Sequence, residues 1–165
     1  MTLWLLIPFL LVVAVAQATL VPLVAVAGYK VDLALVIVVV QGLVGEPGSA
    51  AQWGFILGVF LDLASGLPFG IHMLVLTLIG LLMDLGEAIF FRGNVVAPPI
   101  AMIAGTFVDN VLILAILALF GWSIDWSSYL LRITLPSAIL NTVAMPLAYF
   151  PLQWLHRRVQ PRLEA

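Results

Sequence analysis

Two short apolar runs between Asp32 and Asp62 constrain the fold more than any other part of the chain. The runs are residues 33–44 and 53–61, and a turn over residues 45–48 separates them. A helix rises about 1.5 Å per residue, so the longer run covers roughly 18 Å of a bilayer core that is about 30 Å thick. Lipid cannot satisfy the backbone groups left free at the ends of such short helices. We therefore expect other segments of the protein to cover both runs.

The composition indicates that these runs lie in a membrane. The 165 residues are 64% hydrophobic and 8% charged, whereas soluble domains are about 25% charged. A chain of this length is expected to form a single transmembrane domain over residues 1–165. The net charge of -2 does not favour a nucleic-acid-binding surface. Because cysteine is absent, disulfides and thiolate metal sites are excluded.

Longer apolar segments that can each cross a bilayer make up most of the remaining chain. They are residues 3–27, 70–91, 97–120 and 133–155. Together with the two short runs they predict an all-α integral membrane protein, a six-helix bundle in which helices 2 and 3 are short. A five-helix alternative joins residues 32–64 into one helix, but Pro47 and its neighbouring glycines disfavour a continuous helix there.

The basic residues are divided unevenly between the two sides of this predicted bundle. Most fall on the side of the termini, with Arg92, Arg157, Arg158 and Arg162 on that side and Lys30 and Arg132 on the other. Cytoplasmic segments of membrane proteins carry an excess of lysine and arginine. The pattern therefore favours a multi-pass protein with both termini in the cytoplasm. It does so whether residues 32–64 cross the membrane or form a re-entrant hairpin.

Asp109 is the most unusual residue of the long spans, because it lies midway along residues 97–120. An ionised carboxylate at the bilayer centre costs several kcal/mol, and no lysine or arginine is predicted at that depth. Asp109 is therefore protonated, hydrogen-bonded within the bundle or matched by a partner protein. We expect Asp84, Asp109 and Asn141 to form one polar core. Such a core can be a proton path or ligand site, or it can simply join helices by hydrogen bonds, and we favour the second use.

Asp32 and Asp62 lie at the ends of the short helices, close to water. Asp32 is predicted to cap the helix that begins at residue 33. Asp62 ends a helix rather than starting one, so a hydrogen bond to the following turn, which contains Ser65 and Gly70, explains it better than capping. His72 lies just beyond this turn. It can pair with Asp62 or be satisfied at the membrane interface, and we favour the second alternative.

Gly54 and Gly58 are four residues apart in the second short run. This spacing places both glycines on one face of a helix, where small residues allow a second helix to approach closely. Ala101 and Gly105 repeat the spacing in residues 97–120. Faces of this kind can bury the chain against itself or dock a second protein, and the sequence leaves both alternatives open.

The sequence lacks the motifs that catalysis by a membrane protein would need. No Gly-x-Gly-Asp pattern surrounds Asp62, Asp84 or Asp109, and no serine lies in a Gly-x-Ser-x-Gly motif. The two histidines are far apart in the sequence, which gives no pattern of metal ligands. We therefore expect a protein that is not an enzyme and that holds no metal or other cofactor.

Residues 28–75 resemble one bacterial family, the rod shape-determining protein MreD. The resemblance is carried by Gly28-Tyr29-Lys30-Val31-Asp32-Leu33, by Trp53-Gly54-Phe55-Ile56-Leu57-Gly58-Val59-Phe60-Leu61-Asp62-Leu63-Ala64-Ser65-Gly66 and by Pro68-Phe69-Gly70. The family commonly has proline where this chain has Val31, a difference that concerns the local turn. Elsewhere the chain is similar to the family in length and hydropathy.

The resemblance implies a non-enzymatic scaffold of the cell-elongation machinery in the bacterial inner membrane. Such a protein binds MreC, a single-span protein with a periplasmic coiled coil, and acts with MreB filaments. Through them it supports the RodA glycosyltransferase and its penicillin-binding transpeptidase in lateral peptidoglycan synthesis. The resemblance also implies a fold similar to the substrate-binding subunits of energy-coupling-factor transporters, and it is compatible with a homodimer.

The alternative function is that of a vitamin-binding subunit of an uptake transporter. A site for a vitamin-sized ligand needs several polar groups that converge on one pocket. The outer side of the predicted bundle offers few such groups, namely Asp32, Asp62, Ser65 and His72. A scaffold needs only a complementary surface, so the scarcity of polar groups favours the scaffold.

Overall fold

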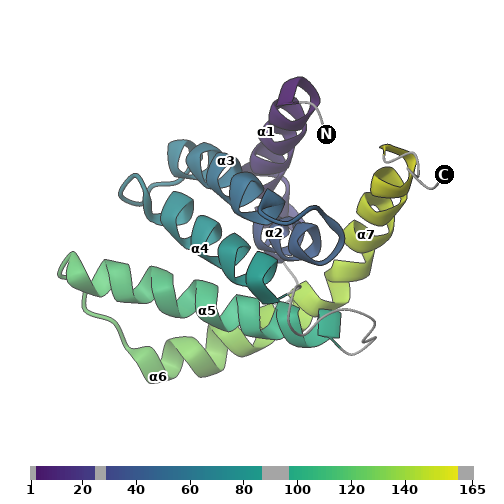
Figure 1. Cartoon of the computed structure of the whole chain (residues 1–165). Coiled ribbons are helices and arrows are strands. Elements are labelled where there is room, and N and C mark those ends of the chain that lie inside the picture. Colours follow the sequence, from purple (N-terminus) through teal and green to yellow (C-terminus); the bar gives the residue numbers. More distant parts are fainter. Residues whose placement is uncertain (1–2, 25–28, 87–96, 160–165) are drawn as a thin grey trace.

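The computed structural model describes residues 3–24, 29–86 and 97–159 of the chain. The main helices are α1 (Leu3–Thr19), α2 (Leu33–Val44), α3 (Ser49–Ala64), α4 (Ile71–Gly86), α5 (Ala97–Leu119) and α7 (Leu135–Val159). The short elements are the 3₁₀-helix η1 (Val21–Val24), α6 (Trp126–Tyr129) and the π-helical segment η3 (Leu130–Thr134). These residues contain no β-strand, and the predicted all-α fold with six main helices is confirmed (Figure 1).

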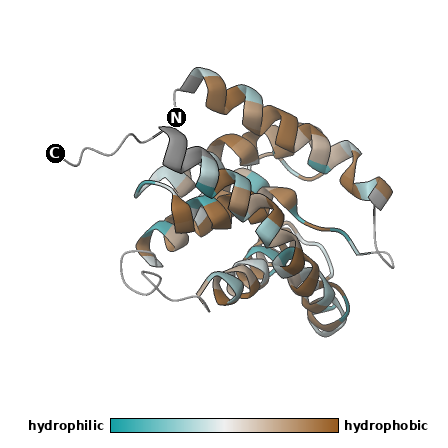
Figure 2. Cartoon of the chain, turned by 90° about the vertical axis from the view of Figure 1, so that its right-hand side faces the viewer, coloured by the Kyte–Doolittle hydropathy of each residue, from teal (hydrophilic) through white to brown (hydrophobic). Residues whose placement is uncertain are grey.

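Three segments are long and apolar enough to cross a membrane, and they identify the chain as a multi-pass membrane protein. They are Trp4–Leu23, Ala97–Leu119 and Trp126–Trp154. Hydrophobic residues also dominate the helices throughout the bundle (Figure 2). A fourth long span was predicted over residues 70–91. Its described part, α4, has 16 residues, and residues 87–91 lie outside the described ranges.

The ends of two long spans differ from those predicted. The first helix stops at Thr19 and is followed by η1, so it is not one continuous α-helix over residues 3–27. The last span begins at Trp126 rather than at residue 133. Its early start has a local cause, because Oδ1 of Asp125 accepts hydrogen bonds from Ser128 N at 3.2 Å and from Ser127 Oγ at 2.9 Å. Hydrogen bonds from Ser128 and Ser127 hold the pKa of Asp125 below its usual range.

Helix α2 forms the centre of the bundle. Every residue from 34 to 42 is buried, and α2 contacts α1, α3, α4, α5 and α7. Its run of valine, leucine and isoleucine has no polar face, which suits a helix that is surrounded on all sides. The prediction that other segments cover both short runs is confirmed for α2, whose apolar surface is shielded from water and from lipid. It is wrong for α3, where Phe55 is 49% exposed. Helix α3 is also not short, because it has 16 residues, as many as the described part of α4.

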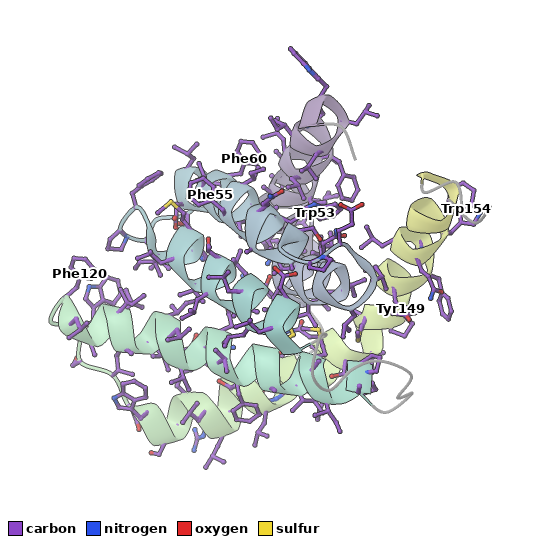
Figure 3. The ribbon with its side chains drawn as sticks, viewed as in Figure 1. Trp53, Phe55, Phe60, Phe120, Tyr149 and Trp154 are labelled. Carbon is purple, nitrogen blue, oxygen red and sulfur yellow. The ribbon has the colours of Figure 1, made fainter. Side chains whose placement is uncertain are left out.

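The first and last helices, α1 and α7, are less buried than the central helix α2. Leu6, Leu10 and Ala14 form the buried stripe of α1. Phe9 packs edge-on against Trp53 of α3, with ring centroids 5.9 Å apart; Trp53 is labelled in Figure 3. Figure 1 shows α7 running beside α5 and then turning away from it. Two prolines, Pro146 and Pro151, lie inside α7, and proline bends a helix because it removes a backbone donor and crowds the preceding turn.

Several residues used to predict the orientation fall outside the described part of the chain. Arg92 and Arg162 lie outside it entirely, as does Gly28 of the family-like segment, and the side chains of Arg157 and Arg158 are also outside it. Lys30 and Arg132 are described, and both are exposed. The position of the termini relative to the membrane therefore stays a prediction.

Candidate functional site

Helices α3 and α4 form an antiparallel hairpin with the closest helix packing in the described chain (Figure 1). A Cβ atom added at Gly58 would lie 2.6 Å from the carbonyl oxygen of His72, and one at Gly80 would lie 2.5 Å from that of Ala50. A Cβ atom added at Gly54 would meet the backbone of Leu76 just as closely. No side chain fits at these distances. Gly54 and Gly58 therefore pack the chain against itself, and they are not free to dock a second protein.

The carboxylate of Asp62 closes one end of this hairpin. Oδ2 accepts hydrogen bonds from Gly70 N at 2.9 Å and from Met73 N at 3.0 Å, and Oδ1 accepts from His72 N at 2.9 Å. Nδ1 of the His72 ring also lies 2.9 Å from Oδ1. Asp62 is only 4% exposed. Its single carboxylate thus satisfies the amides at the start of α4, which have no partner within that helix.

These contacts correct one prediction about Asp62 and decide another. Its bond to Gly70 in the following turn is confirmed, but the view that Asp62 does not cap a helix is wrong, because it caps the helix that comes next. The Asp62–His72 pair, the alternative that was not favoured, is present. Within the turn, Ser65 Oγ accepts from Leu67 N at 3.4 Å, and Gly70 has a φ of +103°, which favours glycine.

Asp84 closes the opposite end of the same hairpin. Its Oδ1 accepts from Ala50 N at 3.3 Å and its Oδ2 from Ala51 N at 3.1 Å, both in the first turn of α3. Each helix of the hairpin therefore supplies the N-terminal cap of the other. A carboxylate at a helix N-terminus is also favoured by the helix dipole. The predicted polar core of Asp84, Asp109 and Asn141 is wrong for Asp84.

A second polar cluster surrounds the start of α2. Asp32 Oδ1 accepts from Leu35 N at 3.0 Å, so the predicted N-cap is confirmed. Asn141 of α7 accepts from Asp32 N at 2.7 Å, and Gln17 of α1 accepts from Leu33 N at 2.8 Å. The amides at the start of the central helix are thus satisfied by side chains of α1 and α7 and by the N-cap residue Asp32.

Asn141 extends this cluster to α5. Its Nδ2 donates to Thr106 Oγ1 at 3.2 Å, and Thr106 Oγ1 in turn donates to the carbonyl oxygen of Met102 at 2.9 Å. Asn141 and Thr106 are both buried. Neither Gln17 nor Thr106 was singled out from the sequence. The available signal for Gln17 was its position as a lone amide in an otherwise apolar helix.

Asp109 lies one turn beyond Thr106 on α5 and is 5% exposed. Within residues 3–24, 29–86 and 97–159, no side chain or backbone amide donates a hydrogen bond to its carboxylate. Asn141 bonds to Asp32 and Thr106 instead. Asp109 and Asn141 therefore lie in one polar region without the direct hydrogen bond that a polar core would have.

The described side chains favour a structural use of these polar groups. In the described ranges, no group of three or more His, Asp or Glu residues is arranged to hold a metal ion. Asp32, Asp62 and Asp84 each bind backbone amides at the start of a helix. Carboxylates bonded in this way satisfy free amides and position the helices relative to one another.

The family model for the rod shape-determining protein MreD matches residues 1–159 of this chain. The chain belongs to the MreD family. No curated protein and no solved structure matches it. The match to the MreD model covers nearly the whole chain, whereas the resemblance in the sequence was carried by residues 28–75. It gives this protein a role in determining rod shape, within a membrane-associated family of structural proteins that acts with MreC and MreB.

Proposed function

We propose that this MreD protein is a non-enzymatic scaffold of the bacterial inner membrane that binds MreC. Through MreC and MreB it would support the RodA glycosyltransferase and its penicillin-binding transpeptidase in lateral peptidoglycan synthesis. The family match over residues 1–159 is the observation that carries the proposal. The bonding of Asp32, Asp62 and Asp84 to backbone amides supports it, because these groups serve the shape of the bundle.

The exposed sides of α1 and α7 are the proposed surface for the partner helix. Within each of the spans Trp4–Leu23 and Trp126–Trp154, 22% of an 18-residue apolar stretch is buried. The corresponding share for the span formed by α5 is 39%. Both helices contact α2, but they do not contact each other in the described residues. Their exposed large apolar side chains include Trp4, Val12, Leu147, Phe150 and Trp154. Figure 3 labels Trp154 on α7.

A single transmembrane helix is the partner that suits such a surface. Helices in lipid associate through close van der Waals contacts and interhelical hydrogen bonds. The exposed side chains named above are apolar, so van der Waals packing against the partner helix would dominate over hydrogen bonding. MreC supplies one membrane-spanning helix according to the resemblance, and a second copy of this chain is the other occupant to be considered.

The proposed orientation places both termini in the cytoplasm. The start of α1 and the end of α7 lie on the same side of the bundle in Figure 1, in agreement with the excess of basic residues near the C-terminus. The bundle, with its six main helices and a short helix at its centre, is also compatible with the proposed likeness to the substrate-binding subunits of energy-coupling-factor transporters.

Affinity purification from native membranes tests the proposed function against its alternative. A tagged copy of the full chain is solubilised in mild detergent, captured and examined by mass spectrometry of both proteins and small molecules. A scaffold predicts recovery of MreC in near-stoichiometric amount. A bound vitamin in stoichiometric amount, or a transporter ATPase in place of MreC, would support an uptake subunit and contradict the scaffold.

A further inference from the structure

Exposed aromatic side chains gather at the turn between α5 and α6. Phe120 is 62% exposed and Trp122 is 55% exposed, and Trp126 at the start of α6 is also exposed. They follow Leu119, the last residue of α5, which is 87% exposed. Figure 3 shows Phe120 at the tip of α5, at the end of the bundle away from Trp154. We refer to residues 119–126 as the aromatic tip.

The shape of this turn is fixed by its own hydrogen bonds. Gly121 has a φ of +85°, and its amide donates to the carbonyl oxygen of Ala118 at 3.0 Å. The amide of Trp122 donates to the carbonyl oxygen of Leu117 at 3.1 Å. This pair of bonds around a left-handed glycine is the Schellman motif, which ends a helix in one defined way. Because Ile124 also packs against the core, the turn is ordered and its exposed rings keep a fixed position.

The aromatic tip lies where two membrane-crossing segments end. The spans Ala97–Leu119 and Trp126–Trp154 are joined only by residues 120–125. At about 1.5 Å per residue, the 23 residues of α5 rise roughly 35 Å, slightly more than the hydrocarbon core of about 30 Å. A connection this short cannot extend far from the membrane. The tip must therefore lie close to the surface of the bilayer.

The backbone after Trp122 needs contact with water. Among the described residues, no group accepts a hydrogen bond from the amides of Ser123, Ile124 or Asp125. Ser123 and Asp125 are also exposed. Lipid tails offer no acceptor for such amides. Residues 123–125 are therefore expected outside the hydrocarbon core, among headgroups and water.

The side chains just before this segment need the opposite environment. Leu119 and Phe120 are large, apolar and exposed, so they are suited to lipid tails and not to water. The indoles of Trp122 and Trp126 each combine an apolar ring with an N–H group, which donates to no described residue. Side chains of this kind favour the boundary between headgroups and tails. The step from hydrocarbon to water therefore falls between Leu119 and Ser123.

We propose that the aromatic tip is an anchor that binds the surface of the phospholipid bilayer and fixes the depth of α5 and α7. Leu119 and Phe120 insert between the acyl chains. The indoles of Trp122 and Trp126 lie at the level of the glycerol groups, and residues 123–125 contact headgroups and water. With both termini in the cytoplasm, this surface is that of the outer leaflet. The anchor adds to the scaffold function and does not depend on the identity of the partner protein.

The anchor is expected to accept neutral and anionic phospholipids alike. The charged residues at this end of the chain are Asp125 within the tip and Arg132 on η3, and both are exposed. Their opposite charges give this surface no net attraction for anionic headgroups. Anchoring by inserted rings differs in this respect from lipid recognition by a cluster of basic residues. The position of the tip should therefore be the same in bilayers of either charge.

Cysteine labelling of the full chain in lipid nanodiscs tests the predicted boundary. The sequence has no cysteine, so Leu119→Cys and Ser123→Cys each provide a single thiol. Because the reactive thiolate forms in water, Ser123→Cys should react with a membrane-impermeant maleimide about tenfold faster than Leu119→Cys. Both variants should react equally once the protein is unfolded in sodium dodecyl sulfate. Equally fast labelling in nanodiscs would place the tip in water, equally slow labelling would place it in the hydrocarbon core, and either result would overturn the proposal.

Fluorescence quenching by brominated lipids measures the depth of the indole directly. Trp122 is kept as the only tryptophan, with phenylalanine at positions 4, 53, 126 and 154. Bromine close to the headgroup should quench its emission about twice as strongly as bromine at the end of the acyl chain. The matched control keeps only Trp53, which is 3% exposed and should be quenched less than Trp122 by the shallow bromine. Equal quenching of Trp122 by both lipids, or stronger quenching by the deep bromine, would contradict the anchor.

Lipid composition and native membranes separate a lipid anchor from two alternatives. The ratio of labelling rates between Ser123→Cys and Leu119→Cys should be the same in neutral and anionic nanodiscs. A boundary that forms only with anionic lipid would mean that Arg132 drives binding, against the proposal. In isolated native membranes Ser123→Cys should stay reactive, and its protection there alone would show that a partner protein covers the tip instead of lipid. The nanodiscs contain no partner protein, so failure of the scaffold function would leave the nanodisc results unchanged.

Discussion

The α3–α4 hairpin and helix α5 differ in what satisfies the carboxylates of their aspartates. In the hairpin, Asp62 and Asp84 each receive backbone amides from the first turn of the facing helix. On α5, Asp109 is as buried as Asp62 and receives no hydrogen bond from the described residues, whereas Asp84 is half-buried. The difference follows from where helices begin, because only the first turn of a helix has free amides to offer.

This contrast shows that burial alone does not determine what an aspartate does in a membrane protein. An aspartate that faces a helix start can remain ionised and hold two elements together. An aspartate that faces the middle of a helix finds every amide already bonded, so its charge has to be neutralised in another way. Four substitutions, taken from the largest expected effect to the smallest, can break or sharpen this comparison.

Gly58→Leu should have the largest effect. The new side chain would meet the backbone at His72, so α3 and α4 would have to separate and both caps of the hairpin would be strained. We expect a loss of about 3 kcal/mol or more in the free energy of unfolding, measured by denaturant titration in detergent and followed by circular dichroism. Gly66→Leu is the matched control, because nothing lies within 4 Å of a Cβ at Gly66. Equal effects of the two variants would show that the glycine contact is not tight.

Asp62→Ala should follow, because it removes the acceptor for the amides of Gly70, His72 and Met73. Loss of an N-cap together with the unpaired buried amides is expected to cost on the order of 2 kcal/mol. Asp62→Asn retains one acceptor oxygen and should cost less than Asp62→Ala. Unfolding in the same denaturant series measures both variants. If Asp62→Ala were neutral, the cap would have no role in holding the hairpin.

Asp109→Asn should change the free energy of unfolding by less than about 0.5 kcal/mol. The amide is close in shape to the neutral carboxyl group, so little is lost if Asp109 carries a proton. The comparison with Asp62→Asn at neutral pH is the informative measurement, since the same chemical change should be costly in the hairpin and cheap on α5. If Asp109→Asn lost more free energy of unfolding than Asp62→Asn, the view that Asp62 is held by hydrogen bonds to its charge and that Asp109 is neutral would be contradicted.

Asp125→Asn should have the smallest effect, because both residues are good N-caps. Hydrogen bonds from Ser128 and Ser127 lower the pKa of Asp125 in the folded state. The stabilisation it gives is therefore present above the ordinary carboxylate pKa of about 4 and lost as pH falls through the lower folded value. Hydrogen exchange of the α6 amides should show acid fraying in the wild type that is absent in Asp125→Asn. Identical acid profiles would contradict the cap.

Local features of this bundle were predictable from the sequence, whereas contacts between distant segments were not. The six apolar segments and the Asp32 cap depend on neighbouring residues, and the short helix α2 is covered as its length requires. Asp62 and Asp84 were misjudged because each caps a helix other than its own. The sequence did contain a signal for this arrangement. Asp62 lies as far from the start of α3 at Ser49 as Asp84 lies from the start of α4 at Ile71. The two carboxylates therefore occupy matching positions of two 16-residue helices.

The partner of each close-packing glycine was also hidden from the sequence. Gly54 and Gly58 were recognised by their spacing, but the face they meet depends on how α3 and α4 turn toward each other. Gly80 on the opposite helix is as close to the backbone as Gly58, yet it has no second glycine four residues away. Its role becomes visible only when the two helices are placed side by side.

Site-specific photo-crosslinking in living cells tests the scaffold most directly. The crosslinker is placed at Val12 of α1, at Leu147 of α7 and, as a control, at Leu63 of α3, all three of which are exposed apolar positions. If α1 and α7 form the partner surface, adducts with MreC will form at positions 12 and 147 and not at 63. Adducts with MreC at position 63 alone, or at none of the three positions, would contradict the proposed docking surface and the scaffold built on it.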